Sequence, residues 1–181
     1  QAATDPATQR IPQGPVAAMV AIKQLGTNGG GWYGPNSSNP LENPTPLSNA
    51  LQTIALVLIP MAMVWLMGFM LKDAGFARMS FIVMAMLSLS FIAVTVWSEQ
   101  QPNNAFAGLA AVAGNMEGKE VRFGTDLSAL WASWTTQTSN GSVNAMHDSL
   151  NPWAGLMTRA GMLINAIWGG IGCGLINFIV Y

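Results

Sequence analysis

The sequence predicts an all-α membrane protein in which spanning helices alternate with short pore helices. Only 8% of its 181 residues are charged and 51% are hydrophobic, whereas soluble domains are roughly 25% charged. Two short apolar helices each run into a hydroxyl–Asn–Gly triplet, at 27–29 and 139–141. The stretches that carry no charge and are long enough to cross a bilayer, which takes about 20 residues, are 47–71, 79–97 and 160–181. Together these features amount to about one and a half span–pore–span units.

The composition also narrows the class of protein. A net charge of −1 provides no basic surface for nucleic acid. The single cysteine, Cys173, cannot form an internal disulfide or a cysteine metal cluster. Gln1 is not an initiator residue and no signal peptide is visible, so we expect a piece of a longer protein.

Residues 1–46 are expected to form an outer loop, a pore helix and a glycine-rich segment. Pro15 suits the first turn of a helix over 16–25, which is too short to cross a bilayer. Four glycines follow within 26–31. In a membrane, such bare backbone is tolerated only where it is buried in protein or lines a wet cavity. Its carbonyl oxygens can there replace the water shell of a cation, although an ordinary surface turn would explain this segment if it stood alone.

The segments 47–71 and 79–97 are predicted to be antiparallel spans, because only 72–78 joins them. Pro60 should kink the first span. We place 72–78 in the cytoplasm, so that the glycine-rich loop enters from outside. The aromatic residues Trp32, Trp97 and Trp153 would then fall near the outer interface.

The second half of the chain is predicted to repeat this order. An extracytoplasmic loop, 98–125, carries Glu99 and four further charged residues, which are expected to be solvated, with shaping of the pore entrance as the alternative: Glu117, Lys119, Glu120 and Arg122. In 126–152, Asp126 is a plausible N-cap for a second pore helix over 127–138, which precedes Ser139-Asn140-Gly141. The last span, 153–181, is expected to unwind where glycines, each costing about 1 kcal/mol in a helix, accumulate: Gly169, Gly170, Gly172 and Gly174.

The two triplets are the sharpest functional signal. They lie 112 residues apart, and each is followed by a polar return containing Asn-Pro and then by a span. Internal repeats around a common site are typical of membrane transporters. The repeat therefore favours two pore loops over two unrelated surface turns.

At these motifs the sequence resembles the A subunit of bacterial potassium-transporting ATPases (KdpA). The resemblance extends in order through nearly the whole chain and is carried by AIKQLGTNGGG at 21–31, ENPTP at 42–46, NMEGKE at 115–120, RFG at 122–124, VNAMHDS at 143–149 and GGIG at 169–172. Members of that family are about three times longer and have four span–pore–span repeats. The chain would thus cover the second pore loop through the third repeat of the potassium-transporter superfamily fold.

The resemblance implies roles for particular residues. The second selectivity-filter segment would comprise Thr27, Asn28, Gly29 and Gly30, and the third would comprise Ser139, Asn140 and Gly141. Asn140 stands where many relatives carry cysteine. The glycines Gly169, Gly170, Gly172 and Gly174 would form a gate below the filter.

The resemblance further implies a potassium-binding and translocating subunit of an ATP-driven, high-affinity uptake complex in the bacterial inner membrane. The transported ion would be K⁺, with no organic cofactor. The partners would be a P-type ATPase catalytic subunit, an accessory subunit and a further small subunit of the same complex, within the lipid bilayer. The chain has no Asp-Lys-Thr-Gly motif or nucleotide loop, so hydrolysis would belong to the catalytic subunit. A passive channel or symporter subunit, and a membrane module without an ion site, are the alternatives.

Two further features have structural interpretations. His147, Asp148 and Ser149 are adjacent in sequence and cannot face one another as a catalytic triad; we expect them to hydrogen-bond within the return loop. Lys23 either pairs with a loop residue or places a positive charge near the ion path, and pairing is favoured.

Overall fold

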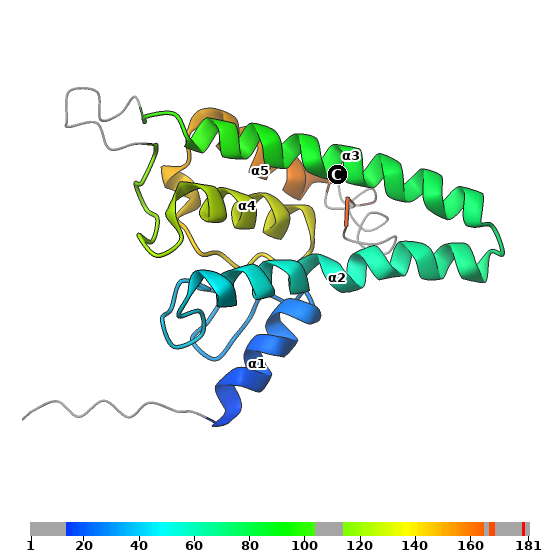
Figure 1. Cartoon of the computed structure of the whole chain (residues 1–181), viewed down its shortest axis with the longest axis horizontal. Coiled ribbons are helices and arrows are strands. Elements are labelled where there is room, and N and C mark those ends of the chain that lie inside the picture. Colours follow the sequence, from blue (N-terminus) through cyan, green and yellow to red (C-terminus); the bar gives the residue numbers. More distant parts are fainter. Residues whose placement is uncertain (1–13, 104–113, 165–166, 169–178, 180–181) are drawn as a thin grey trace, which may run out of the picture.

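The computed structural model describes residues 14–103, 114–164, 167–168 and 179. Regular structure in these residues is helical (Figure 1), which confirms the all-α part of the prediction; pairing between extended segments within them is limited to isolated bridges. The elements are α1 (Gly14–Leu25), α2 (Pro46–Met70), α3 (Ala74–Glu99), α4 (Gly124–Gln137), the 3₁₀ turn η2 (His147–Ser149) and α5 (Pro152–Ile164).

Helices α2 and α3 form a long antiparallel hairpin (Figure 1). They have 25 and 26 residues and mean hydropathies of 2.2 and 2.3, enough to cross a membrane. α2 begins with a capping box between Thr45 and Ser48 and continues past Pro60 as one helix. α3 begins earlier than predicted because the side chain of Asp73 caps it, accepting a hydrogen bond from the Phe76 N–H at 2.9 Å. The connection is thus shorter than 72–78.

A small apolar core lies where α4 packs between α2 and α3 (Figure 1). The α2 side chains Leu56, Val57 and Val64 meet the indole rings of Trp131 and Trp168 there. The remaining faces of the hairpin are open: only 28% of the most apolar stretch of α2, and 11% of that of α3, is buried. Core helices of soluble proteins are mostly buried, so these faces fit contact with lipid or with further membrane helices.

The start of α4 differs from the prediction. The N-cap of α4 is Phe123 rather than Asp126, so the predicted cap was wrong. Gly124 has a φ of 68°, and the backbone turns into the helix there. Asp126 lies in the first turn and accepts a hydrogen bond from Gln100 Nε2 at 3.2 Å.

Helix α5 begins at Pro152, one residue before the start given for the last span, and continues through the exposed Arg159. Its buried residues, Ala154, Thr158 and Gly161, follow the three-to-four-residue spacing of one helix face. The predicted gate glycines, 169–174, lie outside the described residues.

Candidate functional site

The first triplet lies directly after the C-terminal end of α1. The backbone turns sharply there, with φ values of 48° at Thr27 and 71° at Gly29. Positive φ is rare for a β-branched residue such as threonine and costs of order 1–3 kcal/mol. Asn28 closes the turn: its Oδ1 accepts from the Gly30 N–H at 3.0 Å and its Nδ2 donates to the Ile22 carbonyl at 3.2 Å. The Asn28 side chain therefore fixes the loop to the helix end.

The second triplet follows α4 and has matching local geometry. Gly141 has a φ of 70°, and Asn140 Oδ1 accepts from the Ser142 N–H two residues later at 2.9 Å, as Asn28 does from Gly30. The Gly29 N–H donates to the carbonyl six residues earlier, that of Lys23, at 3.3 Å, and the Gly141 N–H likewise to that of Thr135 at 3.4 Å. Two equivalent hydrogen bonds and the left-handed glycine therefore occur in both triplets, whereas the positive φ of Thr27 has no counterpart at Ser139.

The fold brings the two triplets into direct contact. The hydroxyl oxygens of Thr27 and Ser139 lie 3.3 Å apart. A Cβ atom added to Gly29 would overlap the carbonyl oxygen of Asn140, so glycine is required at this crossing. Residues more than a hundred positions apart in the chain therefore meet at one place.

The main-chain oxygens of both triplets are free of intramolecular hydrogen bonds within the described part of the chain. The oxygen of Asn140 lies against Gly29, where an added Cβ would overlap it. In the described ranges there is also no group of three His, Cys, Asp or Glu side chains that could hold a metal ion. The local chemistry is thus that of carbonyl and hydroxyl oxygens, which suit hard cations.

A buried ion pair supports the first triplet from behind. Lys23 Nζ lies 3.0 Å from Glu42 Oε2, with side-chain exposures of 0% and 1%. The other carboxylate oxygen accepts from the Tyr33 N–H at 2.8 Å, and Lys23 Nζ also donates to the Gly34 carbonyl at 3.2 Å. The predicted pairing of Lys23 is confirmed.

The charged residues of the loop after α3 are less solvated than predicted. Lys119 Nζ lies 2.6 Å from Glu99 Oε2, and both side chains are fully buried. Arg122 donates to the carbonyl of Asn43 at 2.7 Å and to that of Ser38. The prediction of a solvated loop was wrong for Lys119 and Arg122, because the fold brings an acceptor to each cation from a distant segment.

His147 lies in η2 and forms no triad. Ser149 Oγ bonds to Glu117 Oε1 at 3.3 Å rather than to the imidazole, and His147 Nε2 is buried without a partner. Burial lowers the pKa of His147 below 6.5, an effect that the nearby charge of Asp148 opposes.

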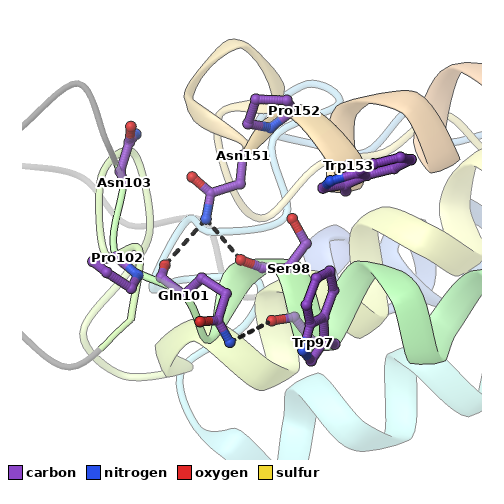
Figure 2. A pocket seen from close by; sticks show the side chains of 8 residues that line it. All are labelled: Trp97, Ser98, Gln101, Pro102, Asn103, Asn151, Pro152 and Trp153. Carbon is purple, nitrogen blue, oxygen red and sulfur yellow. Dashed lines mark hydrogen bonds between the residues drawn. The ribbon is translucent and has the colours of Figure 1, made fainter.

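A separate pocket of about 580 Å³ lies where α3 ends and α5 begins. Figure 2 shows the Asn151 amide directed at the main chain of α3, where its Nδ2 donates to the carbonyls of Ser98 at 2.7 Å and Gln101 at 3.1 Å. Trp97 and Trp153 also line the pocket. No charged side chain lines it, so it offers no strong cation or anion site.

Sequence reasoning missed the side-chain contacts that join the segments, namely those of Asn140, Gln24, Gln52 and Glu99. A signal existed for Gln52: Asn49, Gln52 and Thr53 share one face of an otherwise apolar helix. Polar residues at that spacing in a span indicate a face turned toward protein.

Comparison with known proteins identifies one family. The family model described as "Potassium-transporting ATPase A subunit" matches residues 1–181. Among curated relatives, the potassium-transporting ATPase potassium-binding subunit of Solidesulfovibrio magneticus is 48% identical over 97% of this chain. Those of Pseudomonas aeruginosa and Flavobacterium psychrophilum are each 47% identical, over 97% and 96%. The chain spans 31% of the length of each relative.

Proposed function

Because this chain belongs to the family of potassium-transporting ATPase A subunits, we propose that it forms part of the ion-selecting pore of an ATP-driven K⁺ uptake complex. Main-chain oxygens of Thr27, Asn28, Gly29, Ser139, Asn140 and Gly141 hold dehydrated K⁺ entering from outside, and Gly30 completes the first segment. The observation that carries the proposal is the meeting of the two triplets, whose carbonyl oxygens accept no hydrogen bond from the residues that the structure describes.

The matching geometry of the triplets supports a repeated pore loop. Two segments cannot surround an ion, so further loops of the longer protein complete the ring. The open faces of α2 and α3 are consistent with packing against those repeats or against lipid of the bacterial inner membrane. Gly169, Gly170, Gly172 and Gly174 form the gate beneath the filter.

The proposed partners follow from the naming of the relatives as subunits of a potassium-transporting ATPase. A P-type catalytic subunit hydrolyses ATP, and two small accessory subunits complete the assembly. K⁺ is the transported ion and needs no organic cofactor. Loss of transport when ATP is removed from proteoliposomes separates this function from that of a passive channel or symporter.

The test of the filter is the pair Gly29→Asp and Gly141→Ala in the intact complex. At Gly29 any side chain overlaps the Asn140 carbonyl. At Gly141 a methyl group meets open space, but a φ of 70° costs an L-residue roughly 1–2 kcal/mol. We expect weaker K⁺ uptake and entry of other cations in both variants, more strongly in Gly29→Asp.

Gly124→Ala is the matched control, with a φ of 68° and open space around the added methyl group, but at the start of α4. It should keep the selectivity of the parent complex. Parental K⁺ affinity and selectivity in both triplet variants would refute the filter assignment.

A further inference from the structure

The side chain of Asn140 is bonded to the C-terminal end of α1. It is 4% exposed. Its Nδ2 donates to the Lys23 carbonyl at 3.0 Å and to Gln24 Oε1 at 3.2 Å. The second triplet is thus bonded to the helix that carries the first.

The Lys23 carbonyl is a shared acceptor, because it also receives the Gly29 N–H at 3.3 Å. One main-chain oxygen therefore holds a residue of each triplet. A shift of the Asn140 amide changes the separation between the two segments directly.

The bonded chain continues behind the site. Gln24, which is 1% exposed, donates from Nε2 to Gln52 Oε1 at 3.0 Å, and Gln52 Nε2 donates to the Glu42 carbonyl at 2.9 Å. The chain of amides thereby fixes α1 to α2 and to the return loop. Groups in such a buried network hold defined positions, because breaking any link leaves a buried polar atom unpaired.

We propose that Asn140 is a positioning residue that sets the distance between the two filter segments, and thereby the preference of the pore among K⁺, Rb⁺ and Na⁺. This inference rests on the proposed function. It differs from direct ligation, because the Asn140 carboxamide acts on the Lys23 carbonyl and Gln24 rather than on the ion.

The test compares Asn140→Leu and Gln24→Leu with Asn151→Leu in the full purified complex. Asn151 is the matched control: its Nδ2 also donates to two acceptors across elements, but at the pocket of Figure 2. The readout is ATPase activity titrated separately with K⁺, Rb⁺ and Na⁺.

Asn140→Leu should raise the half-maximal K⁺ concentration about tenfold, the size expected when a buried amide loses its bonds. It should also change the Rb⁺-to-K⁺ ratio, with a smaller effect on maximal velocity. Gln24→Leu should change the half-maximal K⁺ concentration and the Rb⁺-to-K⁺ ratio in the same direction but by less, because the bond from Asn140 to the Lys23 carbonyl remains. Asn151→Leu should leave the ratio at its parental value.

An assembled Asn140→Leu complex with parental ion ratios would overturn the inference. If the Asn140→Leu complex does not assemble, the Gln24→Leu complex provides the test. Parental ion ratios in that complex would likewise overturn the inference. Failure of the proposed function is separate: the unsubstituted complex would then show no stimulation by K⁺.

Discussion

At the scale of single residues, the buried charges behind the first triplet are the most consequential feature. Lys23 and Glu42 neutralise each other in a place that water does not reach. The pair also contacts the glycine segment itself, since a Cβ on Gly31 would lie 2.8 Å from Lys23 Cδ. The fold therefore requires two opposite charges at these positions and leaves no room for larger side chains.

Glu42→Gln should strongly destabilise the protein. It leaves the Lys23 ammonium buried without a counter-charge, which typically costs about 3–5 kcal/mol. The double variant Lys23→Met, Glu42→Gln removes both charges and should recover part of the loss. Thermal unfolding of the full complex in detergent measures both. Glu120→Gln is the control, because its partner Arg122 is 3.5 Å away in a partly exposed pair; an equal loss there would contradict this explanation.

His147 predicts a dependence of stability on pH. Because burial lowers its pKa in the folded state, the unfolded chain binds the proton more readily. The contribution of His147 to stability is thus complete above pH 6.5 and is lost as the pH falls from 6.5 through the lowered pKa. Hydrogen exchange in 143–151 should quicken on acidification after correction for intrinsic rates. His147→Gln should abolish that part of the change, and an unaltered profile would contradict the assignment.

The sequence predicted which residues form the triplets, but it did not predict their side-chain partners. The glycines and asparagines were recognisable because left-handed turns favour those residue types. The bond from Asn140 to the Lys23 carbonyl joins residues 117 positions apart, and the acceptor is a main-chain atom that every residue possesses. No sequence pattern marks such a bond.

At the scale of elements, the crossing of α2 and α3 depends on one glycine. A Cβ on Gly68 would overlap the Cβ of Ala77, so the two helices touch near the connection. Small residues at such crossings allow membrane helices to approach closely. The hairpin geometry is therefore sensitive to a single methyl group.

Gly68→Ala and Gly155→Ala should have opposite effects on the thermal stability of the complex. The first forces α2 and α3 apart and should lower the thermal stability of the complex, by about 1–3 kcal/mol as for other overpacked sites. In the second, the methyl group meets open space within α5, and alanine favours a helix by up to about 1 kcal/mol. A neutral Gly68→Ala variant would show that the crossing is not tight.

The helices themselves were predictable, whereas their ends were not. Uninterrupted apolar stretches predicted α2 and α3 because they are long enough to cross a bilayer, where a helix satisfies every backbone hydrogen bond internally. The observed start of α3 differs from the predicted one because the Asp73 side chain caps the helix. The start of α4 differs because Gly124 supplies the turn. The end of a helix depends on one or two local bonds, which the pattern of apolar residues does not specify.

At the scale of the whole molecule, the loop after α3 is fixed to both halves of the chain. The Glu99 carboxylate accepts from Lys119 at 2.6 Å, from Asn115 at 3.0 Å and from the Asn151 N–H at 2.7 Å. Arg122 reaches the return loop of the first triplet. The loop thus joins the surroundings of both triplets on one side of the molecule.

The proposed orientation predicts which positions a reagent can reach from outside the cell. Val121 is 88% exposed in the loop after α3, and Lys72 is exposed at the opposite end of the hairpin. In a cysteine-free variant of the full protein, Val121→Cys should react with a membrane-impermeant maleimide in intact cells. Lys72→Cys should react only after the membrane is opened. The reverse pattern would place the triplets on the cytoplasmic side.

The coupling of the two triplets through the Lys23 carbonyl has a consequence for mutational tolerance. The oxygen belongs to the backbone, so replacing the side chain at this position does not delete it. Gly29 also bonds there through a main-chain group, its N–H, which proline alone would remove, so Asn140 is the donor at this junction that a side-chain substitution can delete. Weakening the acceptor itself requires a chemical edit, such as an ester in place of the amide between Lys23 and Gln24, which no codon can encode.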